Sequence, residues 1–131
     1  MLIHTPTLDF PGSLYIVQVL RFWAGLESRQ TRDIVYARQL YNEVVKKASD
    51  DYLAWLEYID LERYAGEPDK ARTLFRRVSQ VNILDGVLRQ RSWSDWIAFE
   101  REVGSLDQLL HATEQCRIKE SEWRYFAVTL W

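Results

Sequence analysis

Residues 55–78 read WLEYIDLERYAGEPDKARTLFRRV, and this stretch has the pattern of one complete helical hairpin. Gly66 can adopt the left-handed backbone that closes a helix. Pro68 suits the first turn of the next helix, because its missing N–H has no intrahelical partner there. In the first half of the stretch, large side chains recur three and four positions apart, which predicts that they share one face of a helix. These residues are Trp55, Tyr58, Ile59, Leu61 and Glu62. The apolar stripe of the second helix consists of Ala71, Leu74, Phe75 and Val78.

The same pattern recurs on both sides of this hairpin. Residues 93–104 read WSDWIAFEREVG and align without a gap, so that Trp93, Trp96, Glu100 and Gly104 take the places of Trp55, Tyr58, Glu62 and Gly66. A weaker copy at residues 20–31, LRFWAGLESRQT, places Trp23 and Glu27 in the same register. The second-helix pattern recurs too, because ARQLY at residues 37–41 matches ARTLF at residues 71–75. The resulting period of 34 residues predicts a stack of two-helix repeats.

The predicted fold is therefore all-α, a right-handed superhelix of about three helical hairpins of the tetratricopeptide type. We place a repeat domain at residues 13–120, with repeats at about 13–48, 50–81 and 86–119. Residues 1–12 are expected to form an irregular lead-in, and residues 121–131 an apolar helix or tail. Ser13, the run Ser49-Asp50-Asp51 and Ser105 are predicted helix caps, the last with Gln108 in a capping box. Ser121 is expected to start a separate helix that folds against the preceding one or enters a subunit contact.

The motif W-x-x-[YW]-x-x-[LF]-E, followed by A-R-x-L-[FY]-x-x-V, resembles the half-a-tetratricopeptide (HAT) repeat. The runs FWAGLE, WLEYIDLERYAGEPDKAR and WIAFEREVGSLD, spread over residues 15–117, resemble the last HAT repeats in the family of the squamous cell carcinoma antigen recognised by T cells. Members of that family are U4/U6 small nuclear ribonucleoprotein (snRNP) recycling factors. The resemblance implies a nuclear protein-interaction scaffold in pre-mRNA splicing. It also implies homodimerisation and docking of ubiquitin-specific proteases.

The chain departs from that family in three respects. It has no RNA-recognition motif, no nuclear localisation run rich in Lys and Arg, and no N-terminal half of the repeat array. We therefore expect a fragment, a short gene model or a short paralogue, and we do not assign RNA annealing to these residues. Two other functions stay open. One is a HAT scaffold in pre-mRNA 3′-end or ribosomal RNA processing, and the other is direct RNA binding.

Composition argues against RNA as the main partner. The 131 residues include 17 Lys and Arg and 19 Asp and Glu, which gives a formal net charge of −2. A protein that binds nucleic acid through phosphates carries a basic footprint, so RNA contact is expected to be indirect or weak. The single cysteine fits a reducing compartment. No signal peptide or membrane-spanning run is evident, which predicts a soluble intracellular protein without membrane contact.

The recurring aromatic and acidic residues allow a functional and a structural interpretation. Trp23, Trp55, Trp93 and Trp96 could stack on single-stranded RNA, but their place on the apolar stripe favours packing between helices. Glu27, Glu62 and Glu100 could serve acid–base chemistry. One glutamate per repeat favours ion pairs inside each repeat instead, with Arg38 as the partner of Glu27 and Arg72 as the partner of Glu62. The positions for which we predict structural roles are Trp23, Glu27, Ala37, Arg38, Tyr41, Trp55, Tyr58, Glu62, Gly66, Pro68, Ala71, Arg72, Phe75, Trp93, Trp96, Glu100 and Gly104.

No catalytic, cofactor or metal motif is present. The chain contains no P-loop, GxGxxG, HExxH or GxSxG sequence. His4, His111 and Cys116 have no recognised zinc spacing. We expect neither an enzyme nor a bound cofactor or metal.

Two groups of residues are candidate partner contacts. Arg72, Arg76 and Arg77, with Lys46, Lys47 and Lys70, are either a basic strip on the inner face of the array or an ordinary solvated surface. Acidic residues interrupt this strip, so an acidic peptide fits it better than RNA. The apolar end of the chain adds further candidates. The residues proposed for partner binding are Lys70, Arg76, Arg77, Trp123, Phe126 and Trp131.

Overall fold

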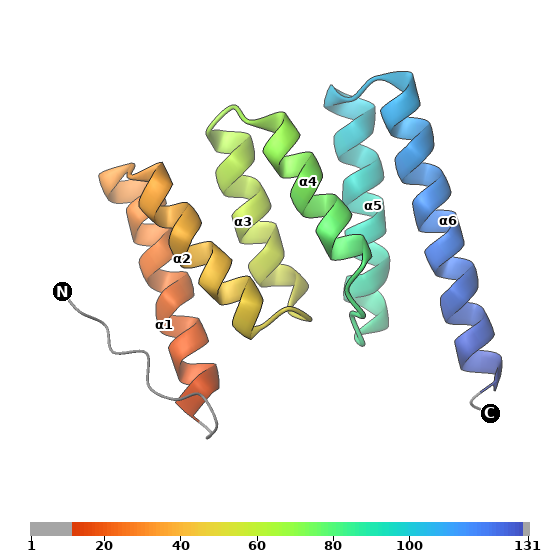
Figure 1. Cartoon of the computed structure of the whole chain (residues 1–131), viewed down its shortest axis with the longest axis horizontal. Helices are drawn as coiled ribbons and strands as arrows, with labels where there is room; N and C mark the ends of the chain where they lie inside the picture. The colour runs from red at the N-terminus through yellow and green to blue at the C-terminus, as the bar shows by residue number, and fades with distance from the viewer. Residues whose placement is uncertain (1–11, 130–131) are drawn as a thin grey trace. The chain divides into compact units, whose positions relative to one another are not determined.

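The computed structural model describes residues 12–129, and every regular element in that range is a helix (Figure 1). The predicted all-helical class is confirmed for these residues. The chain divides into two compact units, Met1–Gly66 and Glu67–Trp131. No helix of the described part is both long and apolar enough to cross a bilayer.

The first unit contains three α-helices, and α1 continues into a short π-helix. The elements are α1 (Gly12–Leu26), the π-helix η1 (Glu27–Thr31), α2 (Ile34–Lys47) and α3 (Tyr52–Tyr64). Helix α2 packs against both α1 and α3. Tyr41 of α2 and Tyr58 of α3 stack with their ring centroids 5.6 Å apart. The buried side chains of α1 and α2 are Val17, Leu20, Ala24, Ala37, Leu40, Tyr41, Val44 and Val45.

The helix starts in this unit show where local sequence signals succeed. Asp33 caps α2 by accepting a hydrogen bond from Tyr36 N at 3.1 Å, and Asp51 caps α3 by accepting one from Leu53 N at 3.1 Å. The prediction for Ser13 is wrong, because α1 already begins at Gly12. Gly12, the last residue of the expected lead-in, is therefore helical, and residues 1–11 lie outside the described part. The π-helix η1 widens the end of the first helix, and Arg32, the residue that follows it, has a left-handed backbone with a φ of 55°.

The junction between α3 and α4 follows the sequence prediction. Gly66 has a φ of 72°, in the left-handed region that favours glycine. Pro68 occupies the first turn of α4. Gly104, which aligns with Gly66, has a φ of −88° and an extended backbone instead. The two aligned glycines therefore end their helices by different geometries.

The second unit contains α4 (Pro68–Ser79), α5 (Gly86–Val103) and α6 (Leu106–Thr129). Helix α5 packs against both α4 and α6. Phe75 and Phe99 meet across the α4–α5 interface with centroids 5.2 Å apart. Ser105 and Gln108 form the predicted capping box, because Ser105 N donates to Gln108 Oε1 at 2.8 Å and Gln108 N donates to Ser105 Oγ at 3.2 Å. The buried apolar side chains of the unit are Ala71, Leu74, Phe75, Val78, Ile83, Trp93, Trp96, Phe99, Ala112 and Cys116.

Helix α6 overturns the prediction of a separate helix at residue 121. It runs without interruption for 24 residues, and Ser121 lies inside it. The residues around this position form ion pairs three and four apart, which stabilise a continuous helix: Arg117 with Glu114, Lys119 with Glu122, and Arg124 with Glu120. The segment up to Thr129 therefore extends α6 and does not fold back on it.

Candidate interaction surface

A buried ion pair joins α4 to α5 in the second unit. Arg72 Nε donates to both carboxylate oxygens of Glu100, at 3.0 and 2.8 Å, and the two side chains are 7% and 1% exposed. Arg72 Nη1 also donates to Asp69 Oδ1 at 2.7 Å, and Trp96 Nε1 donates to Glu100 Oε2 at 3.4 Å. The hydrogen bond to Glu100 is the largest cause of the raised pKa of Arg72. This network leaves neither charge buried without a partner.

The first unit repeats the arrangement between α2 and α3. Arg38 Nε donates to both oxygens of Glu62, at 3.0 and 2.9 Å, and Arg38 Nη2 donates to Glu62 Oε1 at 2.8 Å. The Glu62 side chain is 3% exposed and that of Arg38 is 22% exposed. In both pairs the arginine Nε donates to both carboxylate oxygens, and the pairs lie at equivalent positions of the repeat.

The ion-pair partners predicted from the sequence were wrong. Arg38 binds Glu62 and not Glu27, and Arg72 binds Glu100 and not Glu62. Each arginine lies on the second helix of one repeat and reaches the glutamate on the first helix of the next repeat. These pairs consequently join successive repeats, whereas the sequence interpretation placed them inside a repeat.

Glu27 has local partners instead. Trp23 Nε1 donates to its Oε1 at 3.1 Å, and Thr31 Oγ1 donates to its Oε2 at 2.6 Å. Trp23 and Trp96 therefore make equivalent indole contacts four residues ahead, to Glu27 and Glu100. Trp23 also packs edge-on against Tyr36, with ring centroids 5.4 Å apart. Glu27 and Glu100 thus have structural contacts with neighbouring side chains.

Three of the four repeat tryptophans are buried. Trp55, Trp93 and Trp96 are 3%, 8% and 2% exposed, whereas Trp23 is half-buried. Trp55 Nε1 donates to the carbonyl of Ser49 at 2.7 Å. A nucleic-acid base cannot stack on the three buried indoles while the helices stay packed.

His111 and Cys116 are the histidine and cysteine positions within the described range, and they lie in different surroundings. No group of three or more His, Cys, Asp or Glu residues among those described is arranged to hold a metal ion. His111 is exposed beside Trp96, with ring centroids 6.3 Å apart. Burial raises the pKa of the Cys116 thiol to about 12, so the thiol stays protonated at neutral pH. His4 lies outside the described residues.

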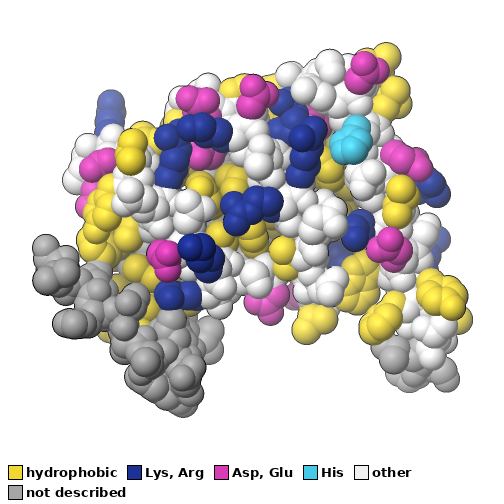
Figure 2. Space-filling view, in the orientation of Figure 1, with side chains coloured by type: hydrophobic (Ala, Val, Ile, Leu, Met, Phe, Trp, Pro, Cys, Tyr) yellow, Lys and Arg dark blue, Asp and Glu magenta, His cyan; other side chains and the backbone are white. Residues whose placement is uncertain are grey.

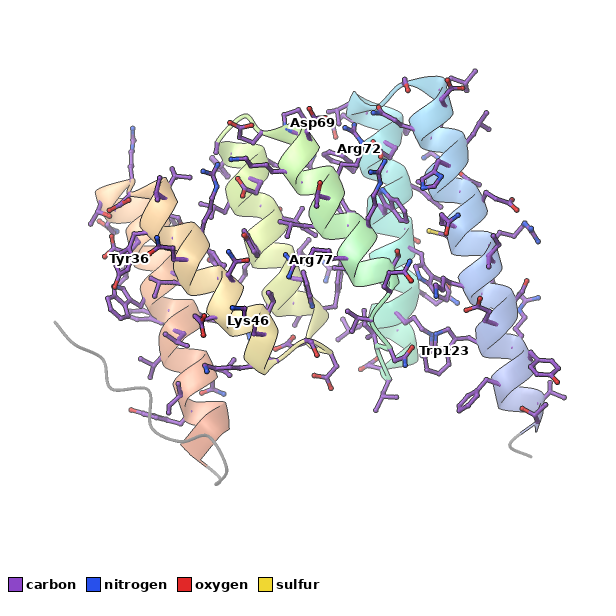
Figure 3. All side chains as sticks on the ribbon, viewed as in Figure 1. Tyr36, Lys46, Asp69, Arg72, Arg77 and Trp123 are labelled. Atoms are coloured by element: carbon purple, nitrogen blue, oxygen red, sulfur yellow. The ribbon has the colours of Figure 1, made fainter. Side chains whose placement is uncertain are left out.

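The predicted basic strip loses one member. Arg72 is 6% exposed and engaged with Glu100, so it cannot contribute to a basic surface. Lys70, Arg76 and Arg77 are exposed on α4. Figure 3 shows Arg72 and Arg77 on α4, with Asp69 at its start. In the first unit, the amine groups of Lys46 and Lys47 lie 3.6 and 3.8 Å from carboxylate oxygens of Glu43.

The apolar end of α6 borders a hollow in the second unit. Figure 2 shows hydrophobic side chains gathered at this end of the helix. Trp123 is half-buried on the side of α6 that faces α5 (Figure 3), and Phe126 is 53% exposed. Trp131 lies outside the described residues. The α6 groove, as we name it, has a volume of about 280 Å³ and is lined by Val78, Ser79, Val81, Asn82, Ile83, Leu84, Arg89, Ser92, Trp93, Lys119, Glu122, Trp123 and Phe126.

Sequence reasoning identified one side of this groove and missed the other. The aromatic run at the end of the chain pointed to Trp123 and Phe126. The loop residues Ile83 and Leu84 and the side chain of Arg89 gave no signal, because they belong to no repeated motif. Only packing brings them to the same place.

Comparison with known proteins places this architecture in a family. Residues 17–129 match the C-terminal HAT repeat of the pre-mRNA-splicing factor Syf1/CRNKL1. The chain belongs to this HAT-repeat family. The predicted HAT fold class is thereby confirmed, with paired helices and a buried Arg–Glu bridge between successive repeats.

Two curated proteins show similarity to this HAT chain. Pre-mRNA-splicing factor CLF1 of Yarrowia lipolytica is 31% identical over 87 residues, which is 66% of the chain and 12% of that protein. Spliceosome associated factor 3, U4/U6 recycling protein, of Danio rerio is 27% identical over 108 residues, which is 77% of the chain and 10% of that protein. The chain thus spans about a tenth of the length of these relatives.

Proposed function

We propose that this HAT chain is a non-catalytic scaffold for protein–protein interaction in pre-mRNA splicing. Its specific setting is assembly or recycling of the U4/U6 snRNP. The observation that carries this proposal is the match of residues 17–129 to a splicing-factor HAT repeat. Both relatives support it, since one is named as a splicing factor and the other as a U4/U6 recycling protein.

The chemistry of the repeat positions supports a scaffold. The glutamates that could have served acid–base chemistry are occupied in structural contacts. Glu62 and Glu100 are each 2% exposed and bonded to arginine, so neither is presented to a substrate. The recurring charged and aromatic residues hold the helices together, so contacts with a partner fall to other residues that are exposed on the surface.

The finer parts of the proposal concern partners. Exposed apolar residues at the end of α6 favour association with another protein surface. They include Tyr125, Phe126 and Val128, which are 73%, 53% and 75% exposed. We propose a homodimer, docking of spliceosomal components and of ubiquitin-specific proteases, and a nuclear location.

The alternative functions have less support. A HAT scaffold of 3′-end or ribosomal RNA processing would share this architecture, but the matched family and both relatives are splicing proteins. Direct RNA binding is disfavoured by the net charge of −2 and by the burial of Trp55, Trp93 and Trp96.

Affinity purification from nuclear extract tests the proposal. The tagged chain is expected to recover splicing proteins together with U4 and U6 RNA, and ribonuclease treatment should leave the directly bound proteins in place. Recovery of only 3′-end cleavage factors or precursor ribosomal particles would contradict a splicing role.

Light scattering on the purified chain at tens of micromolar tests the dimer, which a clean monomer mass would refute.

A further inference from the structure

The end of α6 extends beyond the helix it packs against. At 1.5 Å per residue, the 24 residues of α6 span about 36 Å and the 18 residues of α5 about 27 Å. Ala112 and Cys116 are buried, and the same stripe of α6 continues through Lys119 and Trp123. This stripe reaches Phe126 on the rim of the α6 groove, where the opposite wall is the loop between α4 and α5.

Arg89 is one of the residues that line this groove. Its guanidinium carbon lies 3.9 Å from the ring centroid of Trp123, a close cation–π contact. Its Nη1 donates to the carbonyls of Ile83 and Leu84, at 2.9 and 3.4 Å. Arg89 therefore contacts both the loop and the indole on either side of the groove.

The charge of Arg89 is not neutralised by the residues around it. Its Nε is buried and has no hydrogen-bond partner among the described residues, and no described carboxylate forms an ion pair with it. Lys119, at the same groove, is 3.4 Å from a carboxylate oxygen of Glu122. With this pair cancelling, the groove has one net positive charge, which favours an acidic ligand.

Apolar surface surrounds this charge. Leu84 and Phe126, both lining the groove, are 76% and 53% exposed, and Val87 nearby in sequence is 79% exposed. Large exposed apolar side chains beside a hollow favour the docking of a protein partner. A hollow of about 280 Å³ is suited to one bulky side chain.

We propose that the α6 groove binds a segment of another protein that inserts one aromatic or large aliphatic side chain beside a carboxylate. The apolar side chain packs between Phe126 and the wall formed by Ile83 and Leu84. The carboxylate lies against the guanidinium of Arg89, where a charge-assisted contact is strong. This inference rests on the proposed scaffold function, because it names the chemistry of a partner for that scaffold.

Peptide titration followed by ¹H–¹⁵N NMR tests the groove. The probe is acetyl-Ser-Glu-Trp-Leu-Glu-Ser-amide, and the Trp123→Phe spectrum assigns the indole signal of Trp123. We expect saturable shifts of that signal with a Kd of about 1 mM or tighter. A matched peptide with Lys in both Glu positions should bind about fivefold more weakly or not at all, and so should one with Gly-Gly in place of Trp-Leu. Equal binding of the lysine peptide, or no shift of Trp123, would overturn the proposal.

Matched variants locate the site. Phe126→Ser removes a groove residue, whereas Tyr125→Ser removes an exposed neighbour that does not line the groove. Arg89→Gln removes the unpaired charge, whereas Arg91→Gln removes an arginine on the same helix that lies 3.5 Å from Asp95. We expect Phe126→Ser and Arg89→Gln to weaken binding about fivefold or more, and the two control variants to bind like the parent. Since Phe126 is half exposed, its variant is expected to fold even if Arg89→Gln does not.

A second copy of the chain is the rival occupant. Light scattering that shows a dimer lost in Phe126→Ser, together with no peptide shift in the parent, would assign the groove to self-association and overturn the proposal. The nuclear-extract experiment tests the scaffold function, and its outcome does not depend on the peptide titration. If the chain recovers splicing proteins but does not bind the peptide, the groove assignment is refuted and the scaffold function is still supported.

Discussion

Removal of Arg72 should destabilise the second unit more than any surface substitution. Arg72→Met removes the ion-pair partner of the Glu100 carboxylate, which is 1% exposed. The contact that remains is the hydrogen bond from the indole N–H of Trp96 at 3.4 Å. Removal of one partner from a buried pair typically costs about 3–5 kcal/mol, because the remaining charge is desolvated and uncompensated. We expect a loss of that size in the free energy of unfolding, measured by urea titration with ellipticity at 222 nm. Glu100→Gln keeps the shape and an acceptor, and should cost about 1–3 kcal/mol.

Two further variants separate the buried pair from its surface contact. The double variant Arg72→Met/Glu100→Met should be more stable than either single methionine variant, because replacing both charges by apolar side chains removes the desolvation penalty. Asp69→Asn should cost less than about 1 kcal/mol, since the Asp69 side chain is 93% exposed although it lies 2.7 Å from Arg72. A loss below about 1 kcal/mol for Arg72→Met, or a double variant no better than Glu100→Met, would refute this account of the pair.

The remaining predictions concern two glycines and the cysteine. Gly66→Ala should lower the unfolding free energy by about 1–2 kcal/mol through backbone strain alone, because its φ is 72° and no atom crowds the new methyl group. Gly104→Ala should cost about 1–3 kcal/mol by crowding, since its Cβ would lie 2.6 Å from Glu100 Oε1 and 2.8 Å from the Glu100 carbonyl. An effect confined to Gly66→Ala in urea titrations would contradict the crowding argument. The raised pKa of Cys116, about 12 when folded, predicts stability that is full below the ordinary thiol pKa of about 8.5 and falls as pH rises. Between pH 8 and 9.5 the loss should be about 1.2 kcal/mol, and Cys116→Val should abolish that pH dependence.

Local features were predictable from the sequence because each depends on a few neighbouring residues. The caps at Asp51 and Ser105 formed as expected, since a side chain that satisfies the free N–H groups of a first turn acts within three residues. Gly66 and Pro68 divided two helices for equally local reasons. The 34-residue period predicted stacked helix pairs, because each pair buries the same stripe, and the Trp and Glu spacing carried the resemblance to the HAT repeat.

Ser121 shows where local reasoning failed. A serine is a favoured cap only where the N–H groups after it lack partners. Inside α6 those groups are bonded to the preceding turn, and no Gly or Pro interrupts the chain between Leu106 and Thr129. The ion pair between Lys119 and Glu122 bridges the position further. Ser121 thus lies within a helix because the residues on both sides of it favour a continuous helix.

The sequence by itself determined the pairing of helices, the junction at Gly66 and Pro68, and the residues that recur at each repeat. Tertiary structure alone decided which glutamate each arginine binds, because Arg38 and Arg72 are on second helices whose neighbours come from packing and not from spacing. It also decided the α6 groove, where Arg89 meets Trp123 across 34 residues of chain. Side-chain periodicity records which face of a helix is buried, but it does not record which helix covers that face. That choice depends on how hairpins stack, and the stacking is set by the summed packing of many side chains.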